Sequence, residues 1–215
     1  SDKWEWVSET PVNGQQYYIV CAQQLSGTTS IRAVDSTGKT TVNDINSMAL
    51  YTVSSGKVTI NGTSYTITAN PGTVGGNDLS VYGGYTLKTG SSYLYISSGN
   101  LKTSRLPSVY KLNCIWSFFS VKQKEAHDDY IELKNEVEAI RAKGTDNLTE
   151  GEKALLATYD AIPEGGIKGS STGVSSESSA NVATINEVKE ILAEAQKQVT
   201  IDVTIKPGKY ATLTA

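Results

Sequence analysis

The side chains that most often carry enzyme and metal chemistry are scarce in this 215-residue chain. It has one histidine, two cysteines and one methionine. A lone histidine, His127, cannot supply the paired imidazoles of a common metal site, and no Gly-x-Ser-x-Gly nucleophile elbow accompanies it. Its acidic neighbours predict an exposed position at the start of a helix. We therefore expect no catalytic residue, no metal site and no cofactor.

Carboxylates are sparse where a β-structured hydrolase would need them. The first 122 residues hold six Asp and Glu, and most lie in turns or near the terminus, where they serve the backbone. A glycosidase needs two carboxylates flanking one bond. The glycine clusters at residues 72–76 and 83–84 lack the Lys-Ser/Thr that completes a phosphate-binding loop. The sequence thus favours a protein that is not an enzyme.

Long apolar runs are absent as well. No stretch reaches the roughly 18 residues that span a bilayer, so we expect no membrane span. The net charge of −3 gives no general attraction to nucleic acid. The opening residues Ser-Asp-Lys-Trp lack an initiating Met and the parts of a signal peptide, which indicates a processed end. Together with the polar, Tyr-rich composition, this predicts an extracytoplasmic protein, secreted or on a cell surface.

The two cysteines allow one disulfide at most. Cys21 and Cys114 both fall in expected strands, so a Cys21–Cys114 bridge is one interpretation. The alternative is a pair of buried free thiols, which pack as small apolar groups. The sequence leaves both open.

Charge and aromatic content divide the chain in two. Residues 1–122 hold nine of twelve Tyr, every Trp and Phe, and nine basic against six acidic residues; residues 123–215 hold ten against sixteen. Within the first part, turn signals recur about every 8–12 residues, the rhythm of a β-barrel or sandwich. The clearest hairpin is expected at residues 57–68 around Asn61-Gly62, the pair preferred in type I′ turns. We expect an all-β module over residues 1–122.

The hydrophobic period changes after Val121. Over residues 123–143 the apolar positions follow helical a/d steps, at Ala126, Tyr130, Leu133, Val137 and Ile140. Thr149-Glu150-Gly151-Glu152 and Thr184-Ile185-Asn186-Glu187 match capping boxes, which predicts two further helices. We expect a helical segment over residues 123–199, either a helical hairpin with a third helix or an oligomeric coiled coil.

Two further segments complete the expected organisation. Residues 165–181 are rich in Gly and Ser and indicate a flexible linker. Residues 200–215 alternate strictly before a Pro-Gly turn, which predicts a terminal β hairpin. This hairpin resembles the start of another β module that stops early, so the natural chain is expected to be longer.

Tyrosines gather near the end of the β module. Tyr93 and Tyr95 are two residues apart on an expected strand and so share a face. Exposed aromatic rings stack on sugars and make contacts of low entropic cost. The candidate ligand-binding residues are Tyr82, Tyr85, Tyr93 and Tyr95. The alternative is that these rings cover the rim of the core.

The three tryptophans have a more structural interpretation. Trp4 and Trp6 share one face of the first expected strand. We expect them to form core with Trp116, where the first and last strands meet.

The β module resembles a small domain that recurs in secreted and surface proteins of Bacteroidetes. The resemblance covers residues 4–121 and is carried by Gln-Tyr-Tyr-Ile-Val-Cys at 16–21, by Tyr-Leu-Tyr-Ile and Leu-Lys-Thr within 93–103, and by Cys-Ile-Trp-Ser-Phe at 114–118. It implies a companion module for adhesion or glycan contact, without catalytic residues to carry over. A β-trefoil lectin is a looser match, because Gln-x-Trp repeats are absent.

Two functions fit these observations. The first is a non-catalytic, surface-exposed binding module that contacts glycan or another surface polymer or protein. The second is a structural subunit of a surface appendage or phage virion, a homo-oligomer held through the helical and terminal β segments.

Overall fold

The computed structural model describes residues 2–21, 31–74, 76–79, 83–105, 113–169 and 183–197. The described residues form two compact units. The barrel unit is Trp6–Lys124, and the helical unit combines the described parts of Ser1–Glu5 and Glu125–Ala215. Tyr82, the terminal hairpin at 200–215 and most of the linker at 165–181 lie outside the described residues. The expected order, β structure and then helices, is confirmed.

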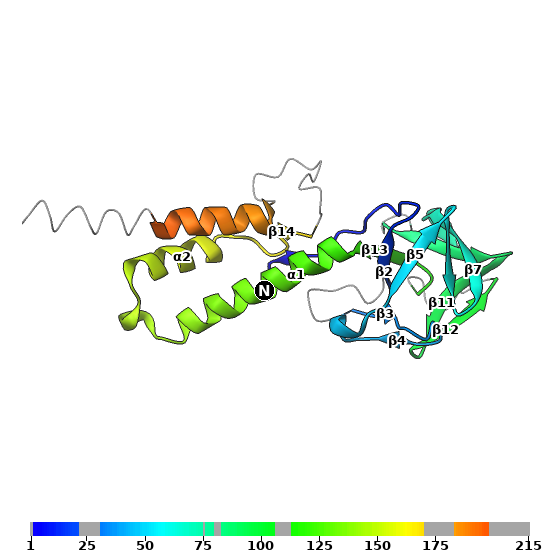
Figure 1. Ribbon diagram of the computed structural model, residues 1–215, viewed down its shortest axis with the longest axis horizontal. Coiled ribbons are helices and arrows are strands. Elements are labelled where there is room, and N and C mark those ends of the chain that lie inside the picture. The colour runs from blue at the N-terminus through cyan, green and yellow to red at the C-terminus, as the bar shows by residue number, and fades with distance from the viewer. Residues whose placement is uncertain are drawn as a thin grey trace, which may run out of the picture. The chain divides into compact units, whose positions relative to one another are not determined.

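The barrel is closed by six antiparallel strands, in the order β2-β5-β6-β7-β10-β13 and back to β2 (Figure 1). Their bounds are Gln16–Cys21, Leu50–Ser54, Lys57–Ile60, Thr63–Ala69, Tyr85–Thr89 and Trp116–Ser120. Closure depends on β13, which pairs with both β10 and β2. Because every barrel strand then has two neighbours, the sheet leaves few open edges.

Additional strands extend this sheet beside β2 and β10. β3 (Ala33–Val34) pairs with β2 and β4 (Thr41–Val42) with β3, while β11 (Ser92–Ser97) and β12 (Asn100–Ser104) continue from β10. β8 (Thr73–Val74) and β9 (Asn77–Asp78) form a separate hairpin, and the short 3-10 helix η2 spans Ile45–Ser47. A bridge between Thr40 and Asn100 brings the ends of the two extensions together.

Alternation of apolar and polar residues fills the barrel. In β6 the burial pattern is exposed, buried, exposed, buried, and the partner strand β7 places Tyr65 opposite Val58. The expected hairpin is confirmed, and Asn61 and Gly62 take φ of 48° and 79° in its turn. The buried indole of Trp116 donates from Nε1 to the Leu94 carbonyl at 3.0 Å. The main core comprises Tyr17, Ile19, Cys21, Val34, Val53, Val58, Ile60, Tyr65, Leu87, Leu94, Ile96, Trp116 and Phe118.

The helical unit holds three α-helices among its described residues, which lie side by side (Figure 1). These are α1 (Val121–Arg141, whose first turn belongs to the barrel unit), α2 (Glu150–Asp160) and a helix at residues 185–197; the 3-10 helix η3 spans Thr145–Asn147. A parallel sheet runs in the order β1 (Trp4–Glu5), β14 (Ile167–Lys168), β15 (Ala183–Thr184). Both expected capping boxes are present. The barrel is therefore inserted in sequence between the first strand of the helical unit and its first helix.

The two residues before β1 add polar contacts to the pairing of this strand. The hydroxyl of Tyr130 donates to Asp2 Oδ1 at 3.0 Å, and the ammonium of Lys3 donates to the Ile162 carbonyl at 2.6 Å. Lys3 Nζ also lies 4.9 Å from the ring centre of Tyr159. Burial raises the pKa of Tyr130 far above its ordinary value, so this phenol stays neutral.

The expected exposure of His127 is wrong. Its side chain is buried, at 3% exposure, while Ala126, expected in the apolar seam, is half-buried. The rings of His127 and Trp4 form a T-shaped pair with centres 5.5 Å apart, and Trp4 stacks on Tyr130 at 5.9 Å. The acidic neighbours did indicate a polar helix face, but Trp4, 123 residues earlier in the chain, covers this position.

The tryptophans are all buried, as expected, but they do not share one core. Trp4 belongs to the helical unit. Trp6 belongs to the barrel unit, where it lies 4.9 Å from Phe119, and Trp116 lies in the main barrel core. Two aromatic residues on one short segment thus serve two different units.

Candidate functional site

The candidate tyrosines divide between the two faces of the sheet. Tyr85 points into the barrel, where it meets Phe118 edge-on at 5.5 Å. Tyr93 and Tyr95 share the outer face of β11, as predicted, and pack half-buried on a small cluster of Val74, Leu79, Cys114 and Ile115. We call Tyr93 and Tyr95 the tyrosine surface. Tyr85 is not part of it.

Strand register surrounds the tyrosine surface with lysine and hydroxyl groups. Tyr93 stands opposite Lys88 on one side and Ser104 on the other, and Tyr95 stands opposite Lys102. Directly opposed residues of antiparallel strands share a face, so these side chains are neighbours. Lys88 Nζ lies 4.9 Å from the ring centre of Tyr93. The surface therefore combines aromatic rings with cationic groups.

A hollow of about 300 Å³ opens at one end of the barrel. Its apolar floor is formed by Ile60, Tyr65, Leu94 and Leu101. The polar residues of its lining are Lys39, Asn61, Thr63, Thr89, Lys102 and Thr103. We call this hollow the barrel mouth. Ends of β-barrels are common places for small-molecule sites, because interior side chains stop short there.

The loop that carries Lys39 is fixed by one carboxylate. Asp35 accepts hydrogen bonds from the backbone N–H of Thr37 at 3.0 Å and of Gly38 at 3.1 Å, and from the Thr37 and Thr40 hydroxyls. Burial alone would raise the pKa of Asp35. The hydrogen bonds outweigh burial and hold the pKa below its ordinary value, so the carboxylate is ionised at neutral pH.

The loop is also tied to the neighbouring strand. The Leu101 N–H donates to the Lys39 carbonyl at 2.9 Å, and the Thr41 N–H donates to the Gly99 carbonyl at 2.9 Å. Gly38 has φ of 67°, and a Cβ there would lie 2.8 Å from the backbone nitrogen of Asn61. One side of the barrel mouth is thus held rigidly.

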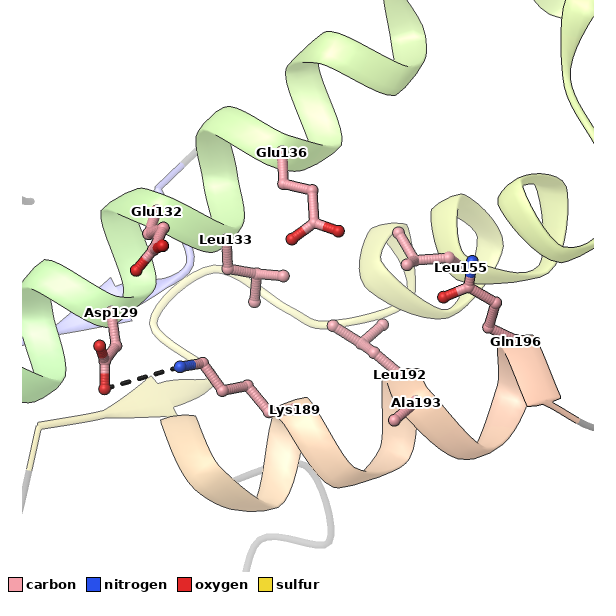
Figure 2. Close-up of a pocket in the computed structure, with 9 residues that line it drawn as sticks. All are labelled: Asp129, Glu132, Leu133, Glu136, Leu155, Lys189, Leu192, Ala193 and Gln196. Carbon is pink, nitrogen blue, oxygen red and sulfur yellow. Dashed lines mark ion pairs between the residues drawn. The ribbon is translucent and has the colours of Figure 1, made fainter.

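The helical unit holds a second hollow, of about 280 Å³, whose lining residues are drawn in Figure 2. Leu133, Leu155 and Leu192 converge on it from α1, α2 and the helix at residues 185–197. The helix α1 adds three carboxylates at helical spacing, and Asp129 Oδ2 lies 3.6 Å from Lys189 Nζ. We call this the helical groove; its lining is completed by Glu132, Glu136, Ala193 and Gln196.

Both cysteines are buried free thiols, Cys21 in the main core and Cys114 in the small cluster under the tyrosine surface. The bridge that the sequence allowed is not formed. Burial raises the pKa of Cys114 to about 11, which keeps this thiol protonated and unreactive at neutral pH. Over the ranges that the structure describes, no three His, Cys, Asp or Glu side chains gather as a metal site, and none of the helices could cross a membrane.

Comparisons with family models, with curated proteins and with solved structures found no match to this chain. The site must therefore be judged on its own residues. Sequence analysis did not single out Lys39, Lys102 or the residues of the barrel mouth. The one available signal was the Asn61-Gly62 turn, which marks an end of the barrel but not which other loops meet it.

Proposed function

We propose that this protein is a non-catalytic binding module, secreted or exposed on a cell surface, that contacts a glycan through the outer face of β11. The tyrosine surface carries the proposal. Its two rings lie among lysine and hydroxyl groups, and sugars present apolar C–H faces and hydroxyls to such a surface. The resemblance of residues 4–121 to Bacteroidetes surface domains is consistent with this function and location.

The tyrosine surface is tested by measuring glycan binding of the full chain and of Tyr93→Leu and Tyr95→Leu variants. Leucine keeps apolar bulk over the Val74 cluster but removes the ring. We expect each variant to bind about tenfold more weakly, the equivalent of one aromatic stacking contact. Tyr18→Leu is the matched control, because Tyr18 is a half-buried tyrosine on β2. If Tyr93→Leu and Tyr95→Leu bound glycan as tightly as the control Tyr18→Leu, the proposal would be contradicted. An array of surface glycans without a hit would also count against it.

An assembly role is the second candidate, favoured by the helical unit. Ile191 is 54% exposed on the helix at residues 185–197, and the helical groove offers an apolar floor beneath carboxylates. Such a surface suits another protein chain better than a sugar. This role requires the protein to form a homo-oligomer. We expect Ile191→Lys to weaken that association, which light scattering measures as a lower molar mass in solution. A strict monomer at high concentration would remove it.

A further inference from the structure

The barrel mouth is distinguished by the sign of its charge. Two lysines, Lys39 and Lys102, are among the residues that line it, and the described lining includes no Asp or Glu. From Asp35 to Arg105, a stretch that contains every lining residue, there are five basic residues and three acidic ones. Clefts lined by one sign of charge concentrate ligands of the opposite sign.

The backbone segments that carry the two lysines are ordered before a ligand arrives. Lys39 is held by the Asp35-centred turn and by the bond from the Leu101 N–H to its own carbonyl. Lys102 directly follows Leu101 on β12, so the same bond fixes the spacing of the two backbones. A binding site whose backbone is already ordered loses less entropy on association.

Other rim groups suit a sugar ring. The hydroxyls of Thr63 and Thr89 and the amide of Asn61 can each donate or accept hydrogen bonds. The floor offers Tyr65, whose side chain is 6% exposed, among aliphatic groups. The mouth therefore has lysine, amide and hydroxyl residues around an apolar base, and its volume matches a small ligand or a single residue of a polymer.

The mouth also adjoins the tyrosine surface. Lys102 lines the mouth and stands opposite Tyr95 across the β11–β12 pair. We propose that the barrel mouth binds the anionic group of an acidic sugar residue, while the next residues of the chain pass Lys102 onto Tyr95. This inference rests on the proposed glycan contact and narrows it to anionic polysaccharides. The anion is a carboxylate, as in uronic acids, or a sulfate ester.

Isothermal titration calorimetry, which measures the affinity of the full chain for each glycan, tests this proposal. The probes are oligogalacturonate, its methyl ester, hyaluronan and chondroitin sulfate; the methyl ester removes charge and keeps the sugar. We expect at least one acidic glycan to bind, and we expect its affinity to fall as the salt concentration rises. If oligogalacturonate is the ligand, its methyl ester should bind at least tenfold more weakly. Binding of hyaluronan or oligogalacturonate shows that a carboxylate suffices as the anion. Binding of chondroitin sulfate alone points to the sulfate ester, because all three probes carry carboxylates.

Lysine variants locate the anion. We expect Lys39→Gln and Lys102→Gln each to weaken binding of the acidic glycan about fivefold, and Lys122→Gln, an exposed lysine of the same unit, to leave it unchanged. Acidic binding that survives both rim substitutions would overturn the proposal, as would a panel without any binder. If neutral glycans bind and Tyr95→Leu weakens them while the rim variants do not, the mouth proposal fails and the glycan-binding function stands.

Discussion

At the scale of single residues, Gly38 and Gly90 form a matched pair. Both take positive φ, 67° and 58°, but a Cβ at Gly38 would lie 2.8 Å from Asn61 N, whereas a Cβ at Gly90 would meet nothing within 4 Å. An alanine in this backbone region costs about 1–2 kcal/mol at either position. Gly38→Ala adds a contact with backbone that cannot rotate away.

We therefore expect Gly38→Ala to lower the unfolding free energy by about 2 kcal/mol more than Gly90→Ala does, because crowding a tight contact costs about 1–3 kcal/mol. Urea unfolding of the two variants measures the difference. Equal destabilisation would mean that the turn is not pressed against the β6–β7 hairpin, and that the barrel mouth is less rigid than described.

The candidate tyrosines show what residue patterns can and cannot predict. Tyr93 and Tyr95 alternate with Leu94 and Ile96, so their shared face followed from period two alone. Tyr85 lies two residues before Leu87 and therefore points to the same buried face. Its closeness in sequence to Tyr93 and Tyr95 had suggested that it belongs with them on an exposed face. To predict which side chains of two neighbouring strands share a face, one must know how the strands are paired. That register depends on residues far apart in the sequence.

At the scale of elements, the strand β1 and the segment that follows it serve two units. Trp4 stacks on Tyr130 in the helical unit, and Trp6 packs on Phe119 in the barrel unit. Removing a buried tryptophan typically costs about 3–5 kcal/mol. We expect Trp4→Ala to accelerate hydrogen exchange in α2 and in α1 beyond residue 125, and Trp6→Ala to accelerate it in β2 and β13.

Exchange followed by mass spectrometry separates these two patterns. The division into units would be wrong if Trp4→Ala loosened the barrel strands and left α2 protected. It would also be wrong if Trp6→Ala acted mainly on the helices.

Local signals predicted several elements well. The Asn61-Gly62 hairpin, the three helices and both capping boxes depend on residues close in sequence, and each is present. Closure of the barrel by β13 and the pairing of β1 with β14 join residues about one hundred positions or more apart. His127 was misplaced for the same reason, since the ring that buries it comes from β1.

At the scale of the whole molecule, charge and architecture follow the same division. The stretch from Asp35 to Arg105, with five basic and three acidic residues, contributes the barrel mouth and the tyrosine surface, while acidic side chains of α1 line the helical groove. This contrast is the reason for proposing polysaccharide contact for the barrel unit and protein contact for the helical unit. Composition alone indicated the division, but only the assembled barrel shows that the segments carrying Lys39 and Lys102 are neighbours.

The most direct measurement is an amide NMR titration of the full chain with hyaluronan and oligogalacturonate oligomers. We expect the largest shifts at Lys39, Asn61, Thr89, Tyr95 and Lys102, with the amides of α2 unchanged. Shifts confined to the residues of the helical groove, or none with either oligomer, would contradict the account.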